Sequence, residues 1–351
     1  MIKAIKYTAF ASAALLALGV TSCKNAENDF PDYEGGVSAY FAYQYPTRTI
    51  TIGEDPEADN TLDNQHKCMI IATQGGAYKS RNLKIDVVVD EALTNNLTFP
   101  DGTPVKAMPS NYYSLASNTL TKVDDYQFGT EVTLTDAFFA DPDAVKETYV
   151  IPLRMVKADG ADYIITGTAV NPESNPASTD DSAWEVKPKD YVLYCVRYIN
   201  EWSGSYCRRG TDNIKDNVTG ATSTVERKAD YVERDEVVYV NTKSLSTAIF
   251  PLSVQYNDGN TTQILTCDLE LTFDASGNCT ISTNTPGMSA SGSGKWVKKG
   301  EKHSINNKDC DALYLTYTVN FGPVTYDTSD TMVMRHREVV PVFDFKPVYN
   351  K

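Results

Sequence analysis

Residues Lys84-Ile85-Asp86-Val87-Val88-Val89-Asp90 place apolar side chains at alternate positions, on one face of an extended chain. The segment 149–155 repeats this alternation, and a period of two is typical of half-buried β-strands. Asp101-Gly102 and Asp159-Gly160 separate such runs with dipeptides that favour the tight turns of β-hairpins. One short helix is expected within residues 136–146, and no long amphipathic helix is indicated. We therefore predict an all-β chain.

The composition indicates a globular protein and excludes one class of partner. The chain has 351 residues, of which 41% are hydrophobic, and this length suits two domains with hydrophobic cores. Its 46 acidic and 32 basic residues give a net charge of −14, whereas nucleic acids are bound through clustered lysines and arginines. We therefore expect no nucleic-acid partner.

The N-terminus has the pattern of an export signal. Lys3 and Lys6 precede an apolar run over residues 9–20, which is too short for a permanent membrane span but typical of a signal peptide. Val20-Thr21-Ser22-Cys23 resembles a bacterial lipobox, in which the cysteine is acylated. We predict a signal peptide at 1–22 and lipid attachment at Cys23; an ordinary cleaved signal with a chance cysteine is the alternative. Contact with the membrane would then be through lipid only, because the protein is acidic.

Composition also suggests the domain boundaries. Residues 23–36 are polar and increasingly acidic, as in a tether. Residues 172–189 are rich in Pro, Ser and Asp, but residues 190–199 have a strand pattern that would otherwise lack a sheet. We therefore expect a long loop at 172–189, a first β domain at 37–200 and a second β domain at 201–351.

Three segments resemble a known family. The tyrosine-rich residues 37–53 and the strand 190–200 resemble the opening and closing of an N-terminal β-sandwich domain in lipoproteins of Bacteroidetes polysaccharide-utilization loci. Trp202-Ser203-Gly204-Ser205-Tyr206-Cys207 resembles the start of the second β domain that is often fused to it. The acidic tether resembles the export signal of lipoproteins that reach the outer surface. The resemblance implies a lipid-anchored protein of the outer membrane, exposed on the cell surface beside a glycan importer complex, like the accessory starch-binding lipoproteins.

The expected architecture and function follow from this resemblance. The first domain is expected to be an immunoglobulin-like β-sandwich that acts as a spacer, and the second a β-sandwich or a lipocalin-like β-barrel. The favoured function is non-catalytic binding of a polysaccharide or oligosaccharide for the neighbouring importer. Two alternatives stay open: an adhesive or fimbrial-accessory structural protein, and a glycoside-active enzyme with an unrecognised site.

Catalytic and metal-binding patterns are weak throughout the sequence. The three histidines are His66, His303 and His336, and a surface position is favoured for each over a role as a catalytic base. Glycosidases need two carboxylates roughly 5–10 Å apart, and no signature of such a pair stands out. The acidic loop 54–63 offers oxygen ligands for calcium but is better explained as a solvated loop. We expect no enzymatic activity, no cofactor and no metal.

Aromatic side chains are the candidate glycan contacts, because sugar rings stack on indole and phenol rings. Trp296 lies between glycines and lysines, and alternation places Lys298 on the same face. We therefore expect an exposed platform with a hydrogen-bond donor in the second domain. Trp184, in the long loop, either packs under the domain or meets a ligand. Tyr206 is a further candidate on the same face as Trp202, although a core position is favoured for both.

Two short segments are candidates for O-glycosylation. Asp181-Ser182-Ala183 and Asp330-Thr331-Met332 resemble acceptor sequences in exported Bacteroidetes proteins. Ser182 is the better candidate than Thr331, because its loop is expected to be flexible.

The six cysteines after Cys23 leave two states open. An even count in an exported protein allows disulfides, and the nearest pairs are Cys195 with Cys207 and Cys267 with Cys279. Cysteines within strand patterns, however, favour buried free thiols.

Overall fold

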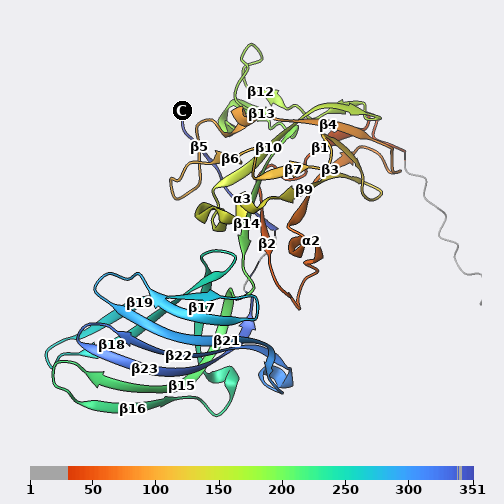
Figure 1. The fold of residues 1–351 in the computed structure, drawn as a ribbon. Helices are drawn as coiled ribbons and strands as arrows, with labels where there is room; N and C mark the ends of the chain where they lie inside the picture. The colour runs from red at the N-terminus through yellow and green to blue at the C-terminus, as the bar shows by residue number, and fades with distance from the viewer. Residues whose placement is uncertain (1–30, 338, 340–341) are drawn as a thin grey trace, which may run out of the picture.

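The structure is a computed structural model that describes residues 31–337, 339 and 342–351 (Figure 1). The predicted signal peptide, the predicted lipid site at Cys23 and most of the predicted tether lie outside the described residues. Two β domains follow one another along the chain, so the all-β prediction is confirmed. No helix within the described ranges is long and apolar enough to cross a membrane.

The first domain is a sandwich of two sheets joined by β8 (Thr119–Lys122), which pairs with β4 in one sheet and with β9 in the other. One sheet contains β11 (Tyr163–Ile164), β1 (Ser38–Tyr40), β3 (Lys67–Gly75), β9 (Gln127–Leu134) and β7 (Tyr113–Leu115). The other contains β4 (Lys84–Val89), β10 (Tyr149–Asp159), β14 (Tyr191–Ile199), β2 (Pro46–Thr51), β24 (Val342–Asp344) and β6 (Lys106–Ala107). Alternate apolar residues of both sheets, such as Ile70 and Ile151, meet in one buried core.

Short helical elements connect these strands. They are α2 (Thr61–Asn64), α3 (Asp136–Ala140) and the 3₁₀ turns η1 (Glu91–Thr94), η2 (Pro142–Val145) and η3 (Asp181–Ala183). The short helix predicted within residues 136–146 is confirmed as α3 followed by η2. The expected long loop at 172–189 carries η3 and the strand β13 (Trp184–Val186), which pairs with β12 (Thr168–Ala169). The predicted closing strand of the domain is β14, which lies between β10 and β2.

The second domain is a closed barrel, so the barrel alternative for this domain is confirmed. Its strands, within residues 204–336, are β15 (Gly204–Asp216), β17 (Glu236–Thr242), β18 (Thr247–Asn257), β19 (Thr262–Phe273), β20 (Asn278–Thr283), β21 (Ser289–Glu301), β22 (Cys310–Asn320) and β23 (Val324–His336). Pairing of β15 with β23 closes the ring. A further strand, β16 (Thr222–Arg227), pairs with the second half of β15, and two 3₁₀ turns, η4 (Val232–Arg234) and η5 (Ile305–Asn307), lie in the connections.

Side chains fill the inside of the barrel. Gly292 and Gly294 leave room for their neighbours on the facing strands: a Cβ at Gly294 would lie 2.4 Å from Leu315 Cδ2 and 2.8 Å from Cys279 Sγ. A buried ionic network shares this interior, where Asp330 accepts hydrogen bonds from Arg208 (2.9 Å), Arg227 (2.6 Å) and Tyr317 (2.7 Å). The barrel is therefore a packed core, in contrast to the hollow interior of a ligand-carrying lipocalin.

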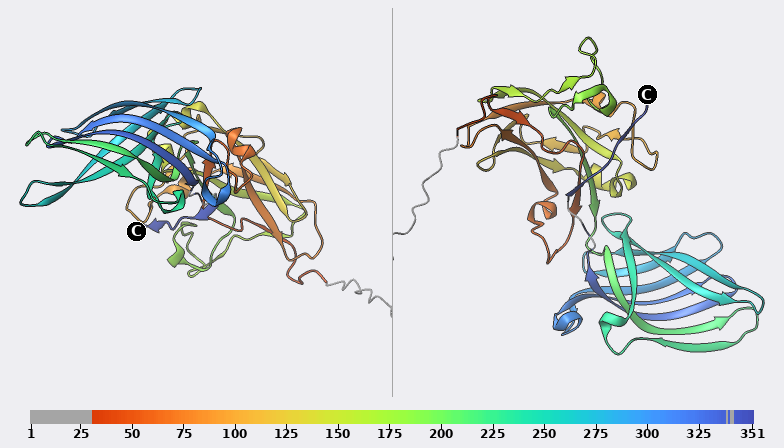
Figure 2. Two further views of the ribbon diagram at one scale, coloured as in Figure 1. Left: turned by 90° about the horizontal axis from the view of Figure 1, so that it is seen from below. Right: turned by 180° about the vertical axis from the view of Figure 1, so that it is seen from behind.

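The end of the chain returns to the first domain (Figure 2). We predicted that residues 201–351 all belong to the second domain, and this is wrong for the last residues. Strand β24 pairs with β2, and β25 (Val348–Tyr349) pairs with β5 (Leu97–Thr98). The physical reason is a second apolar cluster in the first domain, which Phe345 completes with only 5% of its surface exposed.

Candidate functional site

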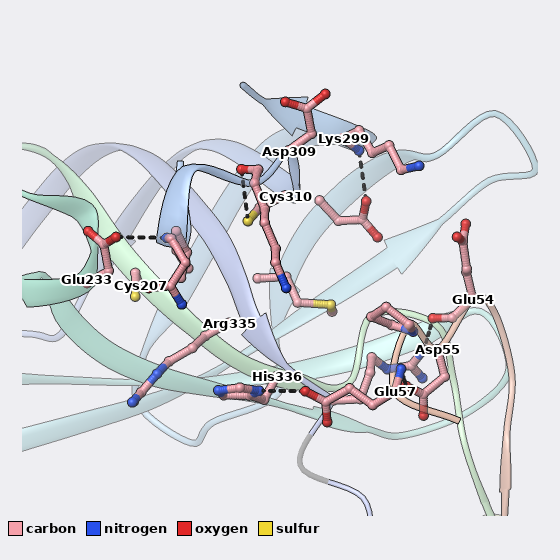
Figure 3. Close-up of a pocket in the computed structure, with 17 residues that line it drawn as sticks. Glu54, Asp55, Glu57, Cys207, Glu233, Lys299, Asp309, Cys310, Arg335 and His336 are labelled. Atoms are coloured by element: carbon pink, nitrogen blue, oxygen red, sulfur yellow. Dashed lines mark hydrogen bonds and ion pairs between the residues drawn. The ribbon is translucent and has the colours of Figure 1, made fainter. Parts of the chain in front are cut away.

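The candidate site is a cavity of about 510 Å³ between the two domains (Figure 3). The first domain contributes the loop 54–57 that follows β2. The barrel contributes residues 334–337 at and just after the end of β23, residues within 299–311 from the end of β21 to the start of β22, and the side chains of Cys207 and Glu233. Segments from opposite ends of the sequence therefore form the cavity together.

Arg337 holds the two domains together beside this cavity. Its side chain, 6% exposed, donates hydrogen bonds to the carbonyl oxygens of Ile52 (3.0 Å) and Glu54 (3.1 Å) in the first domain. It also donates to the carbonyls of Asn200 (2.7 Å) and Ser203 (3.0 Å), where the chain passes into the barrel. Burial lowers the pKa of Arg337. The planar guanidinium of Arg337, where the chain leaves the barrel, is therefore bonded both to the segment 200–203, where the chain enters the barrel, and to the loop after β2.

The connection between β21 and β22 has an unusual backbone. Lys299, His303, Asn306 and Asn307 all have positive φ angles, between 49° and 58°. Non-glycine residues adopt this region rarely, and clusters of such residues occur where a site needs a particular geometry. Hydrogen bonds hold the loop in place: Asp309 accepts from Lys302 Nζ (3.0 Å) and from the His303 N–H (3.2 Å).

Most carboxylates of the barrel wall already have partners. Asp311 accepts from the Lys299 N–H at 2.8 Å, and Glu233 accepts from the Asn306 N–H at 2.9 Å. The hydrogen bond from Lys302 holds the pKa of Asp309 below its ordinary value, and the one from the Asn306 N–H does the same for Glu233. Asp309 and Glu233 therefore stay ionised while they stabilise the loop.

Three cationic side chains on the barrel side of the cavity, in contrast, lack partners among the described residues. Within the part of the chain that the structure describes, the side chains of Lys299, Lys308 and Arg335 form no hydrogen bond or ion pair. Across the cavity, Glu57 Oε1 lies 3.3 Å from His336 Nδ1 and so bridges the domains. Sequence reasoning missed this site, and the one signal that could have pointed to it is the Asn306-Asn307 pair, because asparagine tolerates positive φ.

The expected tryptophan platform is not present. We expected Trp296 to be exposed, but its side chain is 7% exposed and belongs to the barrel core. Tyr206 is fully buried, and its hydroxyl donates to the Trp202 carbonyl at 2.6 Å. The core position favoured for Trp202 is confirmed, since its ring stacks on Phe273 with centroids 3.8 Å apart. Buried rings cannot stack on a sugar in this conformation.

Lys298 and Trp296 do line one hollow, of about 390 Å³, next to Trp202. Lys298 is exposed there, whereas the Trp296 indole is buried. Trp184 is half-buried in its hairpin, and its Nε1 donates to the Ala177 carbonyl at 3.0 Å. Of the two readings of Trp184, packing against its own loop agrees with this hydrogen bond.

The two predicted O-glycosylation residues occupy different environments. Ser182 is exposed in η3, where its hydroxyl donates to Asp180 at 2.6 Å. Thr331 lies within β23, paired with Tyr314 on one side and Arg209 on the other. Modification of either residue stays a prediction.

The described cysteines are free thiols. Cys207 and Cys310 line the cavity, and burial raises the pKa of both, so they stay protonated at neutral pH. Among the described residues, no group of three or more His, Cys, Asp or Glu side chains is arranged to hold a metal ion.

Exposed aromatic rings occur on both domains, and three of them form a cluster on the first domain, which sequence reasoning treated as a spacer. Tyr33, Tyr78 and Tyr126 are 65%, 59% and 43% exposed. They are neighbours, since the Tyr126 hydroxyl donates to the Tyr78 carbonyl at 2.7 Å and the Tyr78 N–H donates to Asp32, next to Tyr33. Tyrosines far apart in the sequence carry no pattern that would have shown this cluster.

Comparisons with known proteins give a consistent two-domain picture. A model described as a domain of unknown function (DUF5627) matches residues 201–338, and a model described as an N-terminal domain matches residues 32–162. A solved structure of a protein of unknown function from Bacteroides ovatus is 41% identical, with a TM-score of 0.85, and the alignment covers 91% of this chain and 100% of that chain.

More distant structures include a multidomain protein with a DUF1735 domain from Bacteroides ovatus (11% identity, TM-score 0.37, 86% of this chain and 96% of that chain). Another is an auxiliary nutrient binding protein from Bacteroides thetaiotaomicron (12% identity, TM-score 0.34, 82% of this chain and 89% of that chain). Similarities this low carry no argument about function. The search of curated proteins gave no match.

Proposed function

Since the chain belongs to the same two-domain family as the Bacteroides ovatus protein of unknown function, we propose its function from its own cavity, as a non-catalytic protein that binds an oligosaccharide between its domains. The observation that carries the proposal is the interdomain cavity with unpaired polar side chains. Its volume of about 510 Å³ falls within the range of about 300–1,000 Å³ that ligand sites occupy, and such sites occur preferentially at domain interfaces.

The lining suits a polyhydroxylated ligand. Hydroxyl groups both donate and accept hydrogen bonds, and the cavity lining combines acceptors on Glu54 and Asp55 of the first domain with donors on Arg335 and Lys308 of the barrel. Ile305 and Met334 add apolar surface for the C–H face of a sugar ring. Arg337 holds the two walls at a fixed distance, which limits the entropy that binding costs.

The proposal includes a location and a partner. Lipid at Cys23, followed by the short acidic tether, would hold the protein on the outer membrane at the cell surface. Bound oligosaccharide would pass from there to a neighbouring importer complex. The support for this part is the lipobox-like sequence and the resemblance of residues 37–53 and 190–210.

The adhesive alternative has less support. A pilin-type subunit uses a spare strand to join the next copy, whereas β24 pairs with β2 of the same chain. The enzymatic alternative is separated from simple binding by analysing the ligand for cleavage products after incubation.

The test is affinity electrophoresis of the intact mature protein in gels that contain plant, host-mucin or yeast glycans. Ile305→Trp places an indole in the cavity and is expected to abolish retardation without changing the melting temperature. Ile264→Trp is the matched control, because Ile264 is 71% exposed on the barrel, outside the cavity lining. Retardation by none of the glycans would refute the function, and retardation unchanged by Ile305→Trp would refute the site.

A further inference from the structure

The two walls of the interdomain cavity differ in charge. The first domain contributes Glu54, Asp55 and Glu57, and Figure 3 shows these three together on one side. On the barrel side, the carboxylates of Asp309, Asp311 and Glu233 are hydrogen-bonded to the loop itself. A hydrogen bond from a backbone N–H does not neutralise a carboxylate, so these three acids offset Lys299, Lys308 and Arg335 in formal charge. Unlike the acids, the three cationic side chains form no hydrogen bond or ion pair within the described residues, so they are the groups of this wall that are free to bind a ligand.

Arg335 is the clearest of these charges. It lies on β23 two residues beyond Val333, which is paired with Cys207 on β15 and with Ala312 on β22. Cys207 and Cys310, the cysteines of this wall, are neutral thiols and cannot neutralise a guanidinium. An exposed arginine with these neighbours keeps its planar fork available for a carboxylate or a sulfate.

Lys299 and Lys308 are placed on the same wall by the strained connection between β21 and β22. Lys299 itself has a φ of 51°, and Lys308 follows directly after Asn306 and Asn307, whose φ angles are 51° and 58°. Such a backbone is strained and persists only where the surrounding structure maintains it. Here it brings two further cations to the cavity wall that carries Arg335.

We propose that the cavity recognises an acidic sugar, whose anionic group binds Arg335 and Lys308 while its ring hydroxyls donate to Glu54 and Asp55. The shared chemistry is an anionic oxygen group, either the carboxylate of a uronic acid or a sulfate ester. This inference rests on the proposed function and specifies its ligand class. The acidic wall accounts for selectivity, because it repels a ligand that is anionic on all sides and accepts hydrogen bonds from a neutral edge.

The experiment compares charged glycans with their neutral counterparts. The intact mature protein is titrated calorimetrically with oligomers of polygalacturonate and their methyl esters, and separately with a sulfated galactan and the same galactan after desulfation. We expect binding of at least one charged form, weakened by salt, and about tenfold or greater loss of affinity for its neutral counterpart, as for a charge-assisted hydrogen bond. The two arms show whether the anionic group is a carboxylate or a sulfate.

Two double variants test the assignment of residues. Lys308→Gln with Arg335→Gln should lose the preference for the charged form. Lys215→Gln with Lys298→Gln removes the same charge from exposed positions outside this cavity and should keep that preference. Melting temperatures of both variants verify folding, and the wild-type comparison decides the ligand class even if a variant fails to fold.

The outcomes are distinguishable. Equal affinity for charged and neutral forms, abolished by Ile305→Trp, would overturn the acidic ligand class and leave the proposed function in place. If both double variants lose the preference for the charged glycan to the same extent, the assignment of the anion site to Arg335 and Lys308 is overturned. Binding of neither form, together with no retardation in the glycan panel, would overturn the proposed function itself.

Discussion

Replacement of Arg337 by methionine should uncouple the two domains. Methionine keeps the aliphatic length of the side chain but donates no hydrogen bond, so the four carbonyls that Arg337 contacts lose their donor. Hydrogen bonds from a charged donor contribute about 1.5 kcal/mol each at the lower end of their range, or about 6 kcal/mol together.

Part of this loss is recovered. No carboxylate among the described residues lies within ion-pair distance of the Arg337 guanidinium, and its lowered pKa reflects the cost of burying its charge. Relief of that cost should return about 3 kcal/mol. The expected net loss of stability is therefore about 3 kcal/mol, which lowers the melting temperature by roughly 6–12 °C for a unit of this size.

Differential scanning calorimetry measures this effect directly. We expect one main transition for the wild type and either an earlier or a divided transition for Arg337→Met. Arg335→Met is the matched control, since Arg335 lies two residues away on the same strand end but is exposed. The reasoning is refuted if the two variants shift the melting temperature equally.

The remaining predictions concern the cores, the anchor and acid stability. Trp296→Ala and Trp202→Ala should both melt early, each losing about 3–5 kcal/mol, and an unchanged melting temperature for Trp296→Ala would contradict its place in the core. Phe345→Ala should cost a similar amount and destabilise the first domain, as limited proteolysis of that domain would show. Cys23→Ala should release the protein from the outer membrane on fractionation; a variant that stays membrane-bound would disprove lipid attachment. Burial raises the pKa of Asp212, but hydrogen bonds from Arg227 and Thr328 outweigh this and leave it below 3.8, so its stabilisation is present above about pH 4 and is lost as the pH falls further. Asp212→Asn should therefore flatten the dependence of melting temperature on pH below 4. If the variant's melting temperature falls with pH as steeply as that of the wild type, the Asp212 carboxylate does not supply this stabilisation.

Local alternation predicted many of the strands, because strands such as β3 and β19 bury alternate residues, whereas β14 is buried on both faces and β16 is exposed. It did not decide between a barrel and a sandwich for the second domain. That choice depends on the pairing of β15 with β23, in which Cys207 meets Val333, and no local pattern specifies contacts so distant in sequence. The return of β24 to the first domain went unpredicted for the same reason.

The error at Trp296 has a more local cause. Neighbouring lysines suggested an exposed position, but in a closed barrel every second residue points inward whatever its neighbours are. The alternation then breaks where the register between β21 and β22 shifts, between Val297 and Glu301, so Lys298 is exposed although Trp296 is buried. The cavity residues were missed because Glu57 and His336, which meet there, come from segments 279 positions apart.

The return of β24 has a consequence for how the chain folds. The barrel closes with its own strands and needs no residue after His336, so it can fold while the first domain still lacks its edge strand and Phe345. During synthesis the first domain therefore emerges first but is completed last. Until the final residues arrive, the edge of β2 is unpaired and open to association with other chains. Loss of a few C-terminal residues by proteolysis would thus damage the domain at the opposite end of the sequence.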